Sequence, residues 1–521
     1  MNSRPSYKCA GRLLMTLAVI CGLALATGCG SNGGLRTPNS DGFSNSNLSG
    51  TYVISISGKD VNTTTGDVVP FAIVGSITAN GRGGITVGTL DLNDPGNTGM
   101  NLGQTVRGTY GITPDGRGAG TLKTSIGSFG IDFVLTSSNH GLITRFDGNG
   151  TGSGTLDLQG SASQSSLKSL AFSLSGADPS GNLLGTVGAF TLESSGSVNS
   201  GTQDFNDDGN SSGSLAGPEN LFAPSSLVLT SGTNGTAQFT SNFGSFGFDV
   251  WVIDSTHLKL IESDTKSSGF ILAGDAFTQQ TSFPAGQLVF TLAGLDSSKD
   301  PFVAGGYAGA TSNGGLSNGV EDYNDAGTAD RQTNVAGSCT TFVAGRCQLA
   351  LTGFSNGIEH PVFGFAAYPS ISGILLLEDD SLGLAQGAAY AQTATAFTAP
   401  ADYGLSLSGV NANPNFNAAW SEVDDIAQFN ATGTGASMTG ILDENDLTTL
   451  VSDAPLSGNY IPQAVATGSG SISVTTNGTL IGGLSLVYYV VNSSSVLFIE
   501  SDSSQVAVGV FEAQTSGPGE K

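Results

Sequence analysis

The chain has 521 residues, of which 11% are charged and 38% hydrophobic, and 77 are Gly. Domains usually span about 100 to 150 residues, so this length excludes a single core. The 42 acidic residues outnumber the 17 Lys and Arg. This balance argues against a nucleic-acid partner, because phosphate binding needs a clustered basic surface. Disorder combines low hydrophobicity with high charge, so the composition favours a folded, turn-rich β protein.

Residues 1–28 have the layout of a secretory signal peptide. Arg4, Lys8 and Arg12 precede an apolar run over residues 13–26. The run is shorter than the roughly 20 apolar residues that a membrane-spanning helix needs. A basic start, a short apolar run and small residues at its end are typical of an export signal that is cleaved.

The end of this signal, Ala26-Thr-Gly-Cys29, resembles the lipobox of bacterial lipoproteins. The resemblance covers residues 1–29, and Ala26 stands where that motif usually has Leu. It implies that Cys29 is diacylated and becomes the N-terminus, and Gly30 resembles the residue that follows the Cys in outer-membrane lipoproteins. We therefore expect an exported protein, lipid-anchored at the outer membrane or cell surface, with residues 29–47 as lipidated Cys and flexible tether.

The remaining cysteines predict one disulfide. Cys9 and Cys21 belong to the signal and Cys29 would carry lipid, which leaves Cys339 and Cys347 for pairing. An oxidising compartment favours a bond between them. Because the loop that it closes is short, the bond is expected to be a local staple across a hairpin.

Three short patterns recur in the same order and divide the chain into four units. The first marker occurs at residues 52–58, 171–176, 290–294 and 403–409, the second at 90–94, 203–207, 321–325 and 442–446, and the third at 142–147, 260–264, 376–380 and 498–502. The predicted units are residues 48–162, 163–281, 282–396 and 397–515, followed by a disordered tail at 516–521. Few contacts are expected across the unit boundaries, so that single units should fold alone.

Alternating apolar residues predict eight short strands in the first unit. They cover residues 52–57, 71–78, 85–92, 106–113, 120–125, 131–136, 142–146 and 154–158. Gly- and Asn-rich turns between them favour antiparallel pairing. The fold class is therefore all-β, with four tandem eight-stranded units. Small closed barrels are preferred over two-sheet sandwiches, because closure removes exposed edges. The Gly50-Thr-Tyr52 opening loosely resembles lipocalin and avidin barrels.

The second marker suggests calcium binding in units 2 and 3. Oxygen ligands alternate before a Gly there, as in calcium loops; they are Asp204, Asn206, Asp207, Asp322, Asn324 and Asp325. The bidentate Glu of an EF-hand is missing, however, and Asp and Asn also favour ordinary turns. Apart from this calcium hypothesis, no cofactor is expected.

The third marker places a Glu within an apolar strand in three units, at Glu262, Glu378 and Glu500. Two-residue alternation puts each Glu on the face of the apolar residue two positions earlier, which would point it into the barrel. Such a carboxylate could hold a ligand, but a solvated Glu at a strand end is the simpler explanation of the pattern. Arg145 takes this position in unit 1.

No catalytic constellation emerges. Gly-x-Ser-x-Gly occurs at residues 209–213, 315–319 and 353–357, but the serine hydrolase turn needs a strand before it and a helix after it. The sequence has three histidines, His140, His257 and His360. The first two share one repeat position and are expected in surface turns. Zinc-type Cys and His clusters are absent from the sequence.

These observations favour a non-enzymatic cell-envelope lipoprotein whose β repeats act as a scaffold for surface spacing or adhesion. The alternative is a barrel protein that binds a small ligand or carbohydrate, and the third is a secreted enzyme acting on glycans. Expected partners are the membrane, through the lipid anchor, and an envelope glycan, lipid or surface protein. Four equivalent ligand sites are not expected, because pocket-type residues do not recur and Trp251 and Trp420 occupy unmatched positions.

Overall fold

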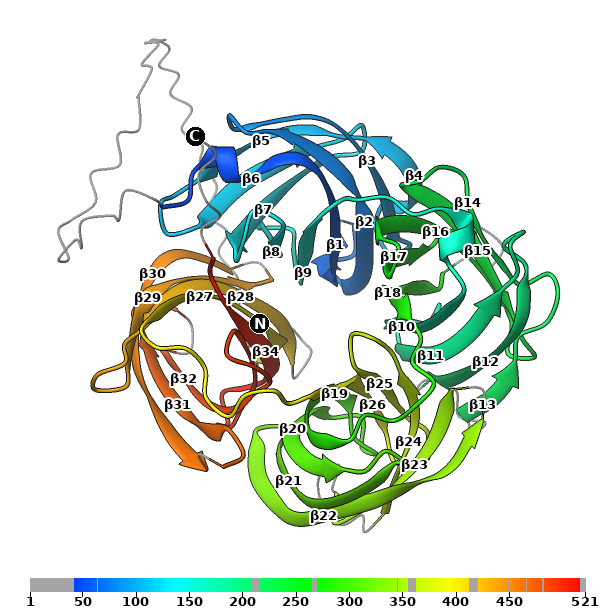
Figure 1. Ribbon diagram of the computed structural model, residues 1–521. Helices are drawn as coiled ribbons and strands as arrows, with labels where there is room; N and C mark the ends of the chain where they lie inside the picture. Colours follow the sequence, from blue (N-terminus) through cyan, green and yellow to red (C-terminus); the bar gives the residue numbers. More distant parts are fainter. Residues whose placement is uncertain are drawn as a thin grey trace, which may run out of the picture. The chain divides into compact units, whose positions relative to one another are not determined.

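The computed structural model describes residues 42–62, 64–207, 215–264, 269–343, 345–354, 362–411, 420–447, 449–464, 466–479 and 482–515. Within them the fold is all-β, apart from two 3-10 helices, η1 (Asn45–Asn47) and η2 (Gln164–Ser166) (Figure 1). No helix of this part is long and apolar enough to cross a membrane. Asp41–Lys521 form one compact body.

Unit 1 is a closed antiparallel barrel, in which β2 pairs with both β1 and β3. Its strands are β1 (Ser49–Val61), β2 (Val68–Asn80), β3 (Gly84–Asp94), β4 (Gly99–Thr105), β5 (Arg107–Ile112), β6 (Arg117–Lys123), β7 (Ser128–Leu135), β8 (His140–Asp147) and β9 (Gly150–Leu158). The fourth predicted strand, residues 106–113, corresponds to β5. Strand β4 before it was not predicted, since its sequence lacks alternating apolar residues.

Unit 2 repeats this strand order in one nine-stranded sheet whose end strands are β13 and β14. An isolated bridge between Ser197 and Ser226 joins the sheet's ends in part. The strands are β10 (Ser169–Ala177), β11 (Leu183–Leu192), β12 (Val198–Asp207), β13 (Leu215–Asn220), β14 (Ser226–Leu229), β15 (Asn234–Thr240), β16 (Ser245–Asp254), β17 (His257–Glu262) and β18 (Ile271–Thr278).

Units 3 and 4 are closed eight-stranded barrels. Unit 3 contains β19 (Gly286–Leu295), β20 (Pro301–Ala310), β21 (Gly315–Asp325), β22 (Thr328–Val343), β23 (Arg346–Thr352), β24 (Val362–Pro369), β25 (Ile374–Glu378) and β26 (Leu384–Ala391). Unit 4 contains β27 (Ala401–Asn411), β28 (Ser421–Ala431), β29 (Ser437–Asp446), β30 (Thr449–Ala464), β31 (Ser469–Thr476), β32 (Gly483–Val490), β33 (Ser495–Glu500) and β34 (Gln505–Ala513). The all-β class and the preference for barrels are confirmed.

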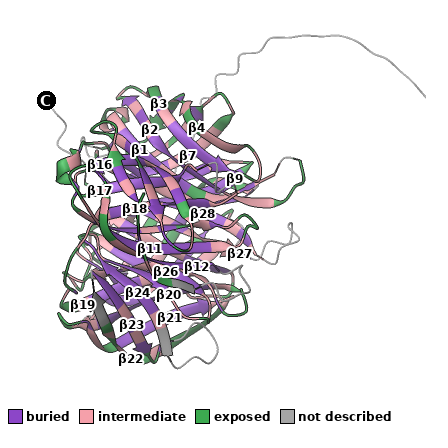
Figure 2. Ribbon diagram, turned by 90° about the vertical axis from the view of Figure 1, so that its right-hand side faces the viewer, coloured by how far each residue is buried: buried purple, intermediate pink, exposed green. Residues whose placement is uncertain are grey.

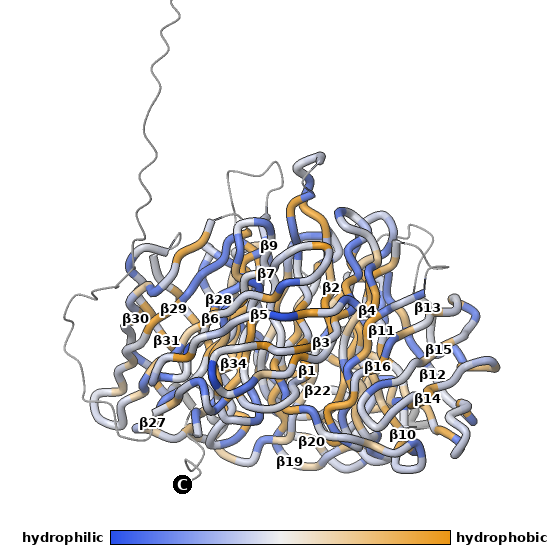
Figure 3. Tube along the Cα trace, turned by 90° about the horizontal axis from the view of Figure 1, so that it is seen from above, coloured by the Kyte–Doolittle hydropathy of each residue, from blue (hydrophilic) through white to orange (hydrophobic). Residues whose placement is uncertain are grey.

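Each barrel encloses its own apolar core. In the first marker the larger residues point inward and alternate with small polar ones, as Leu174 does between Ser173 and Ser175. Figure 2 shows buried residues along the strands and exposed ones mainly in loops. Figure 3 shows apolar residues along strands such as β2 and β16. The repeat pattern therefore follows from the need to fill four cores.

Further apolar clusters join the units to one another, so the expectation of few contacts between units is wrong. Trp251 packs with strands of unit 1, Tyr368 with unit 2 and Tyr489 with unit 3. A fourth cluster joins Val134 of unit 1 to Ile426 of unit 4. Each unit therefore contacts the next in the chain, and unit 4 contacts unit 1, which closes a cycle of four junctions.

Candidate functional site

The Asn of the second marker binds the following unit at every junction. In unit 3, Asn324 at the end of β21 donates from Nδ2 to the backbone oxygens of Glu500 (3.1 Å), Asp502 (2.9 Å) and Gln505 (2.8 Å) in unit 4. Equivalent bonds run from Asn93 to Glu262 and Phe270, from Asn206 to Glu378 and Gly383, and from Asn445 to Arg145 and Gly150.

These acceptors share one position in the fold, at or beside the loop that connects a unit's last two strands. A buried carbonyl group without a donor is unfavourable. An amide group with two N–H donors satisfies both sides of the hairpin end, which an Asp carboxylate cannot do. The invariance of this Asn among the four units therefore has a structural cause.

The preceding Asp of the same marker also reaches the next unit. Trp251 donates from Nε1 to Asp91 Oδ2 at 2.9 Å, and the hydroxyls of Tyr368 and Tyr489 donate to Asp204 and Asp322. All three aromatic residues occupy one repeat position, three residues beyond the strand partner of the third-marker Glu. This shared position was not recognised in the sequence, because Trp251 was matched against the other Trp and not against aromatic residues in general.

The residues of the calcium hypothesis are thus engaged with protein groups in the structure. Besides Tyr368, Asp204 binds Arg346 of unit 3, whose Nε lies 2.7 Å from Oδ2. Asp322 lies 3.5 Å from Arg331, and Asn206 and Asn324 bind backbone oxygens. Among the described residues, no three His, Cys, Asp or Glu side chains are grouped to hold a metal ion. Asp207 and Asp325 end β12 and β21, and calcium binding at these loops stays a prediction.

The third-marker Glu residues are the last residues of β17, β25 and β33 and are fully buried. Burial raises the pKa of Glu262 to about 8 and that of Glu500 to about 9, and it raises the pKa of Glu378 well above its usual value. Asn93 donates to Glu262 Oε2 at 2.8 Å. These carboxyl groups are therefore held protonated beside the junctions.

Unit 1 has a cation where the others have this Glu. Arg145 lies over the ring of Phe71, with 4.8 Å to its centroid, and pairs with Asp60 at 3.3 Å and Asp147 at 3.2 Å. Only 4% of its surface is exposed. Its pairing with two carboxylates compensates the cost of burying a charge.

The described interior of the unit 3 barrel leaves little room for a ligand. A cavity of about 40 Å³ in unit 3 is lined only by apolar side chains, including Phe290, Phe354 and Leu376. That volume admits roughly one or two water molecules. The lumen of unit 3 is thus filled by its own side chains.

A much larger cavity, of about 1010 Å³, lies where the four units meet. Residues of every unit line it, among them Lys59, Ser175, Thr291 and Trp420. They belong mainly to the first and last strands of units 2, 3 and 4, while unit 1 contributes Lys59 and Pro70. The space that could take a ligand therefore lies between barrels and is shared by all four.

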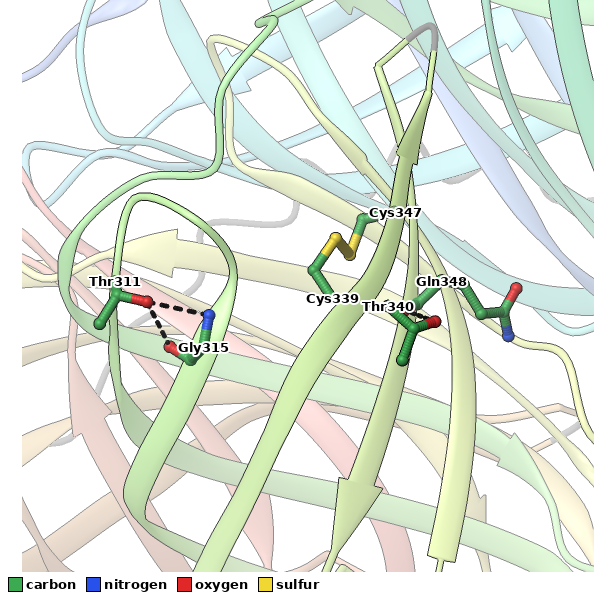
Figure 4. The surroundings of a disulfide bond; sticks show 6 residues. All are labelled: Thr311, Gly315, Cys339, Thr340, Cys347 and Gln348. Carbon is green, nitrogen blue, oxygen red and sulfur yellow. Dashed lines mark hydrogen bonds between the residues drawn. A yellow bond between two sulfur atoms is a disulfide. The ribbon is translucent and has the colours of Figure 1, made fainter.

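Cys339 of β22 and Cys347 of β23 are joined by a disulfide (Figure 4), with 5.5 Å between their Cα atoms. Beside it, Thr340 Oγ1 donates to the backbone oxygen of Gln348 at 3.2 Å. The bond lies within one hairpin of unit 3. Cys29 and its lipobox lie outside the described residues.

The histidines and the serine motifs form no catalytic group in the described part of the chain. His140 begins β8 and bonds Asp157 at 2.6 Å and Glu512 of unit 4 at 3.2 Å. Burial alone would lower its pKa, but these carboxylates outweigh burial and raise it to about 10. Ser317 lies within strand β21, where no helix follows. His360 and residues 209–213 lie outside the described residues.

No family model and no curated protein matches the sequence. Solved structures with some similarity include isotype 1 transferrin binding protein B from serogroup B Neisseria meningitidis, at 9% identity and TM-score 0.21, over 72% of this chain and 83% of that one. Kievitone hydratase from Nectria haematococca has 10% identity and TM-score 0.19, over 44% and 90%. Similarity this low carries no conclusion about fold or function.

Proposed function

We propose that this chain is an exported, lipid-anchored, non-enzymatic scaffold whose four barrels act as one body at the cell surface. The observation that carries the proposal is the use of the repeated polar residues. Asn324 and its three equivalents bind neighbouring units rather than converging on a reaction centre. The repeated polar residues therefore serve to hold the four units together.

The signal sequence supplies the location in this proposal. A lipid on Cys29 and a tether up to about residue 47 would hold the body at the membrane surface. An acidic surface supports solubility there. Such a body would act as a spacer or as a platform for adhesion.

Metabolic labelling with a fatty acid tests the anchor. The wild-type protein is expected to carry label and to partition with membranes, whereas Cys29→Ser should carry none. Cys347→Ser serves as the matched control, because it replaces a cysteine elsewhere, in the disulfide with Cys339, and should leave the label unchanged. An unlabelled wild-type protein would contradict the proposed anchor.

A further inference from the structure

The central cavity has a lining that differs in kind from the barrel interiors. In the strands that carry the first marker, residues pointing inward alternate with residues pointing outward. The inward residues fill the barrel core, and the hydroxyl groups of outward residues reach the central cavity. Ser173 and Thr291 occupy one repeat position, and Ser175 and Ser408 occupy the next outward position. A hydroxyl group both donates and accepts hydrogen bonds, so it suits a ligand that does the same.

Aromatic rings from three units border the same space. Phe277 and Tyr390 share one position in the last strand of units 2 and 3, and Trp420 precedes β28 of unit 4. All three rings are half-buried. Such side chains offer a flat apolar face beside polar groups.

The charged groups of the lining are balanced. They are Lys59, Lys299, Asp275 and Glu422. Lys59 lies 3.7 Å from Glu422, and Asp275 is paired with Lys259 at 2.7 Å and with His257 at 2.6 Å. An ionic ligand would meet no excess of opposite charge here. A purely apolar ligand would leave hydroxyl hydrogen-bonding capacity unused, for example on Ser173, which accepts from Gln386 Nε2 at 2.7 Å and still has its own proton to donate.

We propose that the central cavity binds one neutral, polyhydroxylated chain, an oligosaccharide of several sugar rings. Its volume of about 1010 Å³ lies at the upper end of the roughly 300 to 1,000 Å³ of small-molecule sites, which favours an extended ligand. Because all four units contribute to one cavity, the stoichiometry is one per chain. The proposal names the partner class of the proposed scaffold and does not depend on its lipid anchor.

Calorimetry on the purified full chain tests this with cellohexaose, maltohexaose and the hexamer of N-acetylglucosamine. At least one is expected to bind with a stoichiometry of one. Ala293→Trp, which fills the cavity from β19, should weaken binding at least tenfold. Thr291→Val keeps the side-chain shape and removes one hydroxyl, so a loss of about threefold to tenfold is expected. Ser457→Ala, an exposed Ser on β30, is the matched control and should bind like wild type.

Three results would overturn the proposal: no binding of any of the three sugars at millimolar concentration, a stoichiometry of three or four, or unchanged affinity in Thr291→Val. Binding of 1-decanol in place of the sugars would also contradict it, since that probe tests an apolar site. If Ala293→Trp does not fold, Thr291→Val with Ser175→Ala decides the outcome. Acylation of Cys29 is measured separately, so failure of the anchor and failure of the sugar site are distinguishable.

Discussion

The three junctions along the chain differ from the junction that joins unit 4 back to unit 1. At the first three, an aromatic residue of the next unit donates to the second-marker Asp and packs in an apolar cluster, as Tyr489 does. At the closing junction Val134 takes the aromatic position and the apolar cluster is small. Asp443 instead lies 3.5 Å from Arg117, so ionic contacts replace part of the apolar ones.

The end of the chain nevertheless binds unit 1 as each linker binds the unit that follows it. Gln514 donates from Nε2 to the backbone oxygens of Asp115 at 2.8 Å and Leu135 at 2.9 Å. Gln392, at the end of unit 3, donates in the same way to Thr467 and Val490 of unit 4. Residues within each repeat therefore determine the junction, and a covalent connection to the next repeat is not required for it.

Raising the pH is expected to have the largest effect on the junctions. Burial raises the pKa of Glu262 to about 8 and that of Glu500 to about 9 in the folded chain, while an unfolded Glu titrates near 4.3. The stability gained by burying the protonated carboxyl groups is complete below the unfolded pKa. It is lost as the pH rises from about 4.3 through the folded values. Since one pKa unit corresponds to about 1.4 kcal/mol, each of the two carboxyl groups is expected to contribute a loss on the order of 5 kcal/mol between pH 5 and 9.

Melting temperatures measured across this pH range check the expectation. Glu378→Gln removes one of the titrating groups with little change of shape and should flatten the profile. Glu193→Gln is the matched control, because Glu193 is exposed and should leave the slope unchanged. A protein that becomes more stable toward pH 9 would contradict burial of protonated carboxyl groups.

Removing a junction Asn is expected to have the next largest effect. Asn324→Ala removes the donor from two buried backbone oxygens, those of Glu500 and Gln505, and from the partly buried one of Asp502. Because an unsatisfied buried acceptor costs about 1 to 3 kcal/mol, a loss of about 3 kcal/mol in the free energy of unfolding is expected. Denaturant titration measures it, with the exposed Asn459→Ala as control. Equal losses of unfolding free energy in the two variants would show that Asn324 has no special role at the junction.

A smaller effect is expected at the chain's end and sharpens the comparison between junctions. Gln514→Ala should lower the free energy of unfolding by about 1 to 2 kcal/mol and speed hydrogen exchange in β7 and β8. Gln392→Ala should have less effect, because the chain continues covalently from unit 3 into unit 4. Faster exchange confined to β11, away from the closing junction, would argue against this role of Gln514.

The sequence predicted the barrels well because core filling is local. Inward residues alternate within single strands, so the positions of Tyr52, Ile54 and Ile56 are readable without knowing their neighbours. Strand β4 was not predictable in this way, since its partner β3 rather than its own composition holds it in place.

The role of the second marker was beyond this kind of reasoning, because its contacts join residues far apart in the chain. Tyr489 and Asp322 are separated by 167 positions, and a single sequence gives no sign of such a pairing. A usable signal existed in the invariance of the marker's Asn. A turn or a calcium loop accepts Asp as readily as Asn at most positions, whereas donation to two carbonyl groups requires the amide.

A double-mutant cycle across a junction tests the central claim, that repeated residues of one unit bind the next. The cycle combines Asp322→Ala of unit 3 with Tyr489→Phe of unit 4 and measures their coupling in the free energy of unfolding. A coupling of about 1 kcal/mol or more is expected, since the two residues share a buried hydrogen bond. The control pairs Asp322→Ala with Tyr368→Phe, whose hydroxyl binds Asp204 at a different junction, and should give a coupling near zero. Equal couplings in the two cycles would contradict the assignment of the markers to the junctions.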